Sequence, residues 1–144
     1  MEMDSKRRAL DKIFKRRDRF QIPEWQRDEV WPDHKKQLLI DSILRGWKLP
    51  KFYFSKVSAS PEEYEVVDGQ QRLAAIYEFF DNLLALHGAV GDAASGSLYS
   101  NLPDDIVDRF DDYAIEYHVV FNAPEPELTE LLHSFQVTIH ASAT

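Results

Sequence analysis

The change of hydrophobic period at Asp68-Gly69 constrains the fold more than any other feature of this chain. Before it, residues 63–68 (EYEVVD) have a strand pattern, and after it apolar residues recur with the period of a helix. A single glycine therefore connects a strand to a helix. Residues 51–57 (KFYFSKV) form an earlier aromatic-rich strand, so we expect a β-hairpin followed by a helix. The buried stripe of that helix contains Leu73, Ile76, Tyr77 and Phe80.

The remaining segments alternate between helical, extended and loop patterns. Residues 20–32 contain two prolines and no helical period, so we expect them to be extended. Residues 87–101 contain three of the five glycines together with several Ser and Ala, which predicts a flexible loop. We also predict helices at 4–17, 32–45, 103–110 and 125–136 and a strand at 113–121.

These elements predict one mixed α/β domain with a small mixed sheet flanked by helices. A length of 144 residues and a hydrophobic content of 44% fit one globular domain. The last residues carry no helix cap, so we expect the domain to be cut from a longer protein. The predicted divisions are a basic N-terminal helix (1–19), a core with the main motifs (20–86), the loop (87–101) and a helix-strand-helix segment (102–144).

Several classes of protein are excluded by what the sequence lacks. It contains no cysteine, and no phosphate-binding P-loop or G-x-S-x-G motif is present. Its five histidines lack the paired spacing of a zinc protease. No apolar run approaches the roughly 18 residues of a membrane span, and the N-terminus has no signal-peptide pattern. We therefore expect an intracellular, cytoplasmic protein without a membrane partner.

The net charge of −8 conceals a strong asymmetry along the chain. Residues 1–56 contain 15 of the 17 Lys and Arg and 9 acids, whereas residues 57–144 contain 2 and 16. One interpretation is a DNA-binding strip, with Arg7, Arg8, Lys12, Arg16 and Arg17 on backbone phosphates. We favour the other, in which the cations are solvated or pair with the acidic half. The full strip is Lys6, Arg7, Arg8, Lys12, Lys15, Arg16, Arg17 and Arg19.

The strongest candidate for a site is the D-G-Q-Q-R sequence at the strand-to-helix junction. Glycine permits a tight turn, the first helical turn presents backbone N–H groups, and Gln70, Gln71 and Arg72 add side-chain donors. Such a corner suits a phosphate, and Asp68 could orient a sugar hydroxyl, Mg²⁺ or water. The alternative is purely structural: Asp68 caps the helix and Gly69 makes the turn.

A second motif lies in the extended segment 22–31. Trp25 and Trp31 either fill the core or form a stacking wall for a base. Gln26 and Arg27 could contact phosphate or base edges, although an arginine near acids is often only a surface ion pair.

The order of these motifs resembles the N-terminal domain of GmrSD-type restriction enzymes, a family of ParB-like domains. The resemblance rests on IPEWQRDEVW, RGWKLP and YEVVDGQQRLAAIYEFF, and covers residues 8–86 well. It implies a ParB/sulfiredoxin-like α/β fold. It also implies binding or hydrolysis of a nucleoside triphosphate (NTP) that licenses DNA cleavage, usually in defence against phage.

The resemblance carries over the positions Asp68 to Arg72 and Gln26 with Arg27, and the chemistry of the corner suggests a role for each residue. The predicted catalytic residues are Asp68, which could bind Mg²⁺, together with Gln71 and Arg72. Arg72 would neutralise phosphate charge, and the other nucleotide-binding residues are Gly69, Gln70, Gln26, Arg27 and Trp31. The base of the nucleotide is left open.

Two departures from the family pattern limit this transfer. The sequence after Phe135 lacks the Arg and Asn that continue the last helix in the family. The C-terminal HNH-type nuclease domain of many relatives is also absent, so we expect this part alone not to cleave DNA and a nuclease domain or separate nuclease to be its partner. The competing predictions are a DNA-binding or sensing module without hydrolysis, and a silent scaffold that docks a nuclease.

Overall fold

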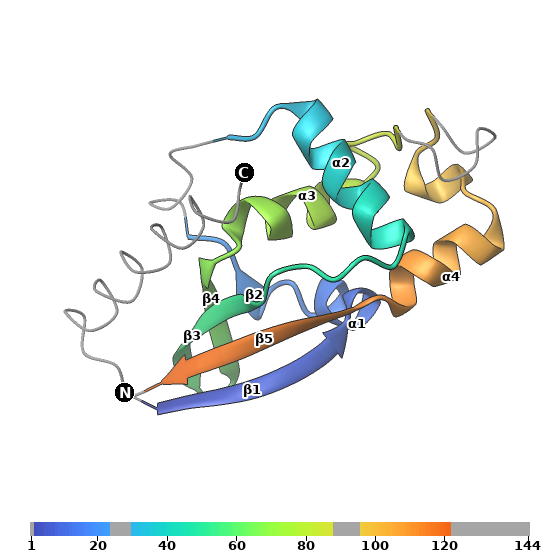
Figure 1. Cartoon of the computed structure of the whole chain (residues 1–144). Coiled ribbons are helices and arrows are strands. Elements are labelled where there is room, and N and C mark those ends of the chain that lie inside the picture. Colours follow the sequence, from blue (N-terminus) through green and yellow to red (C-terminus); the bar gives the residue numbers. More distant parts are fainter. Residues whose placement is uncertain (1, 24–29, 88–95, 122–144) are drawn as a thin grey trace.

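The computed structural model describes residues 2–23, 30–87 and 96–121 (Figure 1). Within these residues it has the mixed α/β content that the sequence predicts. The elements in chain order are β1 (Glu2–Ala9), α1 (Leu10–Lys15), β2 (Phe20–Gln21), α2 (Asp33–Leu44), β3 (Phe52–Ala59), β4 (Glu62–Asp68), α3 (Gln70–Phe80), the 3₁₀ helix η3 (Tyr99–Asn101), α4 (Asp104–Asp112) and β5 (Ala114–Phe121).

The strands form one mixed sheet in the order β1-β5-β3-β4-β2. The predicted hairpin is confirmed, because β3 and β4 pair antiparallel. β5 then inserts between β3 and β1, parallel to β3 and antiparallel to β1. At the other edge, the two residues of β2 pair parallel to β4, with Phe20 opposite Tyr64. The sheet therefore joins the first and last described strands of the chain.

The helices gather on one side and at one end of the sheet. Figure 1 shows α2 and α3 side by side, and α1 and α4 together at the end where β1 finishes and β5 begins. The contacts α2–α3, α3–α1, α1–α4 and α4–α2 close a ring of four helices. Aromatic side chains fill this ring, with Phe79 and Phe80 packed edge-to-face against Phe110 and Tyr99 against Phe79.

A second group of buried aromatic side chains comes from the strands β2, β3, β4 and β5. Phe20 contacts Phe54 and Tyr117 edge-on and stacks with Tyr64, and all four side chains are buried. The alternation of the strands explains this group, since every second residue points to the same face of a sheet. β2 is therefore held in place mainly by the packing of Phe20.

The predicted helix over residues 4–17 is wrong in its first half. Residues 2–9 form β1, and the helix begins only at Leu10. Residues 2–9 have no apolar stripe to bury in a helical ring, whereas their backbone completes a full ladder with β5. The second half agrees with the prediction, because Leu10 and Ile13 are fully buried and Phe14 stacks on Phe80 with ring centroids 4.4 Å apart.

The connection between α2 and β3 is fixed by a side chain from the far end of the chain. The hydroxyl of Tyr113, which directly precedes β5, donates to the carbonyl of Trp47 at 2.7 Å and accepts from the N–H of Leu49 at 3.2 Å. Backbone groups of an irregular segment are thereby satisfied without a strand or helix.

The other predicted elements agree with the structure except near residue 100. The predicted helices at 32–45 and 103–110 correspond to α2 and α4, and the strand at 113–121 to β5. Residues 88–95 of the predicted loop 87–101 lie outside the described residues. The end of that segment forms η3, whose Tyr99 packs edge-to-face against Phe80. The predicted helix 125–136 lies outside the described residues. Within the described part of the chain, no helix is long and apolar enough to cross a membrane.

Candidate functional site

The D-G-Q-Q-R corner, defined as Asp68–Arg72, is a tight junction between β4 and α3. Gly69 has φ = +103°, a left-handed conformation that glycine adopts at little cost. A Cβ atom at this position would lie 2.5 Å from Cδ2 of Phe52, so the backbone packs directly on that ring. Both the turn and the close approach require glycine here.

The first turn of α3 has no side-chain cap in the described residues. Its N-cap is Gly69, which has no side chain, and no side-chain capping hydrogen bond is present there. The structural alternative in which Asp68 caps the helix does not describe this geometry. The positive end of an 11-residue helix therefore begins without the oxygen atom that a Ser, Thr or Asp cap would supply.

Asp68 is a buried carboxylate at the end of β4. Its exposure is 7%, and its Oδ2 lies 3.9 Å from Nη2 of Arg72. Burial raises the pKa of Asp68 above its ordinary value, while Arg72 and a backbone hydrogen bond from Gly69 act in the opposite direction. A buried carboxylate with a raised pKa beside a helix start is a feature that functional sites often share.

Arg72 is engaged by protein groups on several sides. Nη1 donates to the carbonyl of Pro50 at 2.5 Å, Nη2 donates to that of Lys51 at 3.3 Å, and the guanidinium lies over the Phe52 ring at 4.1 Å. Its side chain is 11% exposed, and burial lowers the pKa of Arg72 from its ordinary value. These contacts fasten α3 to the start of β3. The two carbonyls use two of the five N–H donors of the guanidinium. Contact between its other donors and a phosphate stays a prediction.

A hollow of about 250 Å³ runs along α3 beside the corner, and we call it the α3 hollow. The Oε1 atom of Gln71 accepts a hydrogen bond from the Trp31 N–H at 3.3 Å, which brings the end of the extended segment to the corner. Gln26 and Arg27 lie outside the described residues. The lining residues are Ile22, Val30, Lys36, Gln70, Gln71, Ala74, Tyr77, Glu78 and Asp81.

The charged residues of the α3 hollow are paired. Lys36 binds Glu78 at 2.9 Å, and Asp81 binds Arg17 at 2.7 Å. The hollow is therefore close to neutral, and any attraction for an anion would come from the helix start and the glutamine amides.

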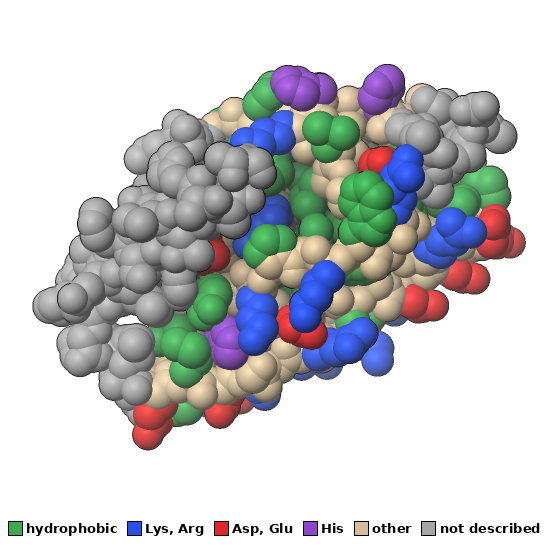
Figure 2. All heavy atoms as spheres, in the orientation of Figure 1, with side chains coloured by type: hydrophobic (Ala, Val, Ile, Leu, Met, Phe, Trp, Pro, Cys, Tyr) green, Lys and Arg blue, Asp and Glu red, His purple; other side chains and the backbone are tan. Residues whose placement is uncertain are grey.

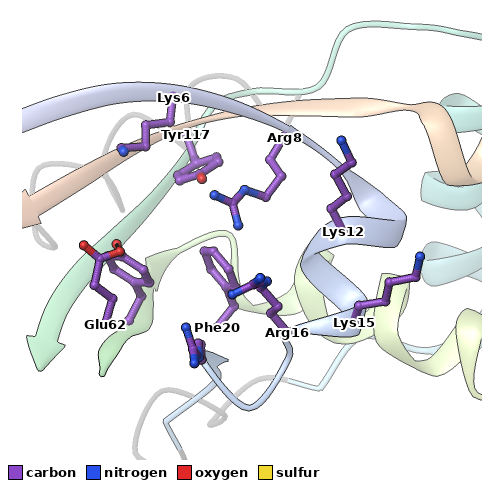
Figure 3. Close-up of a pocket in the computed structure, with 10 residues that line it drawn as sticks. Lys6, Arg8, Lys12, Lys15, Arg16, Phe20, Glu62 and Tyr117 are labelled. Carbon is purple, nitrogen blue, oxygen red and sulfur yellow. Dashed lines mark hydrogen bonds between the residues drawn. The ribbon is translucent and has the colours of Figure 1, made fainter. Parts of the chain in front are cut away.

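A second and larger hollow, of about 500 Å³, lies at the opposite end of β4, and we call it the basic pocket (Figure 3). In Figure 3, Arg8 and Arg16 reach toward Phe20 at its centre, and Glu62 lies across from Lys12 and Lys15. The lining residues are Lys6, Arg8, Lys12, Lys15, Arg16, Arg19, Phe20, Glu62, Tyr64 and Tyr117.

Only some of the predicted DNA-binding cations converge here. Arg8, Lys12 and Arg16 line the basic pocket, but Arg7 lies at a different hollow and Arg17 is held by Asp81 and the ring of Phe14. The predicted strip treated all of them as one helical surface. Because β1 is a strand, neighbouring side chains point to opposite faces and the strip divides.

A family model for the N-terminal domain of the GmrSD restriction endonuclease matches residues 10–138. The chain belongs to this family. The predicted resemblance, which covers residues 8–86 well and continues loosely to the predicted last helix, is thus confirmed. No curated protein and no solved structure matches the chain.

The residues matched by the family model include all of the α3 hollow but only part of the basic pocket. The corner and the whole of the α3 hollow lie within the matched residues, whereas Lys6 and Arg8 of the basic pocket precede them. Sequence reasoning missed Phe20, Tyr64, Tyr117 and Glu62 as members of the pocket. Their only sequence signal is strand alternation, which cannot show that they face α1.

Metal ligands are sparse in the described ranges. No group of three His, Asp or Glu side chains there converges on a point that could hold an ion. Mg²⁺ bound with a nucleotide commonly uses one or two carboxylates and takes its other ligands from phosphates and water. Asp68 can supply one such carboxylate.

Proposed function

We propose that the D-G-Q-Q-R corner binds the phosphates of a nucleoside triphosphate and that this GmrSD N-terminal domain is the nucleotide-responsive part of a restriction system that acts against phage. The observation that carries the proposal is the start of α3: a left-handed glycine and no side-chain cap in the described residues. Backbone N–H groups at such a start attract anions. The adjacent glutamines line the α3 hollow, which offers room beside that start.

The proposed roles follow from where each side chain lies. Gln70 and Gln71 provide amide donors at the first turn, and the buried carboxylate of Asp68 holds Mg²⁺ or the attacking water. The backbone N–H of Trp31 is bonded to Gln71. We propose that Gln26 and Arg27, which precede Trp31 in the sequence, close the other side of the site. Arg72 holds the corner in shape through Pro50 and Lys51, and adds positive potential to it.

In this proposal the nucleotide is hydrolysed slowly or acts as a switch. Gln71 and Asp68 are the groups that could orient a water molecule toward the terminal phosphate. DNA cleavage is assigned to an HNH-type nuclease, either a C-terminal domain of the full protein or a separate partner. DNA is then the substrate of the assembled system rather than of the corner.

Thermal unfolding with each of the four NTPs, with and without Mg²⁺, tests the proposal. A ligand that binds only the folded state stabilises it by about 2.7 kcal/mol at about 100 times Kd. We expect one or more NTPs to raise the Tm, and the double variant Gln70→Ala with Gln71→Ala to lose that rise. Release of inorganic phosphate, followed in the same samples, separates hydrolysis from binding.

The matched control is Gln21→Ala, which removes an exposed glutamine that bonds only the carbonyl of Asp18 in the described structure. It should keep the full rise in Tm. If no NTP shifts the Tm of the folded protein under any of these conditions, or if the double variant retains the rise, the corner is not the nucleotide site.

A further inference from the structure

The cations of the basic pocket lack the carboxylate partners that such a cluster normally has. In the described ranges, Lys6, Lys12, Lys15, Arg16 and Arg19 take part in no ion pair within 4.0 Å. This contrasts with the α3 hollow, where each cation has a partner. The expectation that the basic strip pairs with the acidic half of the chain holds for Arg17 and Asp81 but not for the pocket.

The single acid of the pocket does not neutralise it. Glu62 accepts a hydrogen bond from the Tyr64 hydroxyl at 2.9 Å and lies 3.7 Å from Nζ of Lys56, which is outside the pocket lining. The Tyr64 hydroxyl, Lys56 and, more weakly, Lys6 lower the pKa of Glu62. Six cations and one carboxylate therefore surround one hollow.

The fold places these cations together for simple geometric reasons. Lys6 and Arg8 are two apart on β1 and share one face, while Arg7 between them points to the other. Lys12 and Lys15 are three apart on α1 and so share a face of it, and Arg16, the C-cap residue, follows directly after the helix and also lines the pocket. The repulsion among like charges so arranged is relieved by a multivalent anion.

The shape and lining of the pocket favour a compact ligand. Its aromatic rings belong to the core, since Phe20 and Tyr117 are each 2% exposed, and so the lining offers no open ring on which a base could stack. On the face drawn in Figure 2, cationic and acidic side chains are interspersed. The cations of the basic pocket itself surround one hollow and do not follow a continuous basic stripe. An extended nucleic-acid strand would need such a stripe.

We propose that the basic pocket binds a compact polyphosphate, meaning a ligand with two or more adjoining phosphate groups, at a site separate from the D-G-Q-Q-R corner. Lysine ammonium groups and arginine forks from β1, α1 and the turn before β2 would hold the phosphate oxygens. A free polyphosphate and the phosphate tail of a small effector would supply the same chemistry.

Titration calorimetry of the full chain with inorganic tripolyphosphate and with a short oligonucleotide tests this assignment. The pocket variant is the triple change Lys12→Gln, Lys15→Gln and Arg16→Gln, which keeps good helix formers on α1. We expect wild type to bind tripolyphosphate and the variant to bind it at least about tenfold more weakly, as the loss of charge-assisted contacts implies.

The control variant removes the same charge elsewhere. Arg7→Gln, Lys48→Gln and Arg109→Gln lie outside the basic pocket, and Arg7 is on the opposite face of β1 from its neighbours. This variant should keep wild-type affinity. Circular dichroism and a cooperative melt show whether each variant is folded, and the single change Lys12→Glu replaces the triple variant if that one fails to fold.

Three results would overturn the assignment. They are the absence of tripolyphosphate binding, an equal loss of affinity in pocket and control variants, and binding of the oligonucleotide without tripolyphosphate. The Gln70→Ala, Gln71→Ala variant should bind tripolyphosphate normally. If affinity falls in that variant and not in the pocket variant, the phosphate belongs to the corner instead, so failure of this proposal can be told from failure of the nucleotide site.

Discussion

Gly69 unites two requirements at one residue, a left-handed turn and contact with an aromatic ring. The change of period in the sequence is enough to predict the turn, because it depends on neighbouring residues only. The partners of Arg72 were not predictable in this way. Its acceptors are backbone carbonyls at Pro50 and Lys51, more than twenty residues earlier, and backbone groups leave no trace in sequence composition.

Substitution of Gly69 by Ala should destabilise the domain by about 3 kcal/mol, since the new Cβ meets Phe52 and the left-handed φ becomes costly. Denaturant unfolding measures the change. Gly46→Ala is the control, because φ is +75° there but no atom lies within 4 Å of a new Cβ. That variant should lose only about 1 kcal/mol. Equal losses would mean that the contact with Phe52 contributes nothing.

Asp68 should make stability depend on pH. Its folded pKa is raised above the ordinary 3.8, so the folded protein binds this proton more tightly than the unfolded chain. The resulting stabilisation is fully present below pH 3.8 and is lost as the pH rises through the folded pKa. We therefore expect Asp68→Asn to be at least as stable as wild type at pH 7, with the difference shrinking toward pH 4.

Denaturant midpoints of both proteins between pH 3.5 and pH 7 give this comparison. A variant that is less stable than wild type at neutral pH and equal to it in acid would show that the contact with Arg72 outweighs the cost of burial. Whether Asp68→Asn is more or less stable than wild type, it should also lose any Mg²⁺-dependent effect of an NTP on the Tm.

At the scale of elements, β1 is the strand that local patterns could not reveal. The sequence predicts the hairpin β3–β4 and the helices α2 and α3, and the structure confirms them. β1 has exposed or half-exposed side chains throughout and pairs with β5, more than a hundred residues later. A chain segment rich in Lys and Arg favours a helix by intrinsic propensity, but the ladder with β5 decides its conformation.

Position 5 distinguishes the strand from a helix by experiment. Ser5 is exposed and lies opposite His118 of β5. We expect Ser5→Val to be more stable than Ser5→Ala by up to about 1 kcal/mol, because β-branched residues favour strands and alanine favours helices. Denaturant unfolding of the two variants is the measurement, with wild type as reference. If Ser5→Ala were more stable than Ser5→Val, the result would favour the predicted helix at residues 4–17 over the strand β1.

At the scale of the whole molecule, the D-G-Q-Q-R corner and the basic pocket lie at opposite ends of β4. Glu62 and Tyr64 border the basic pocket, and Asp68 begins the corner; six steps along a strand span roughly 20 Å. The charge asymmetry of the sequence indicated a basic region, but only the fold shows that six of the eight cations of the basic strip share a hollow. Phosphates held at the corner and in the pocket are far enough apart that they should act independently, whereas a ligand filling the α3 hollow would reach Tyr77, whose hydroxyl donates to the Phe20 carbonyl at 2.7 Å.

Stabilisation by an NTP and by tripolyphosphate should therefore be additive within about 0.5 kcal/mol when both are present. Thermal unfolding with each ligand alone and with the two combined provides the comparison. A combined effect no larger than the stronger single effect would mean that both ligands compete for one site.

β1 precedes the region that the family model matches, yet it contributes Lys6 and Arg8 to a hollow whose other walls lie inside that region. The basic pocket is therefore not guaranteed by family membership. It corresponds to a linear signature, K-x-R-x₃-K-x₂-K-R-x₂-R over residues 6–19. That signature offers a way to sort GmrSD-type domains into those equipped with a second anion receptor and those without one, before any of them is purified.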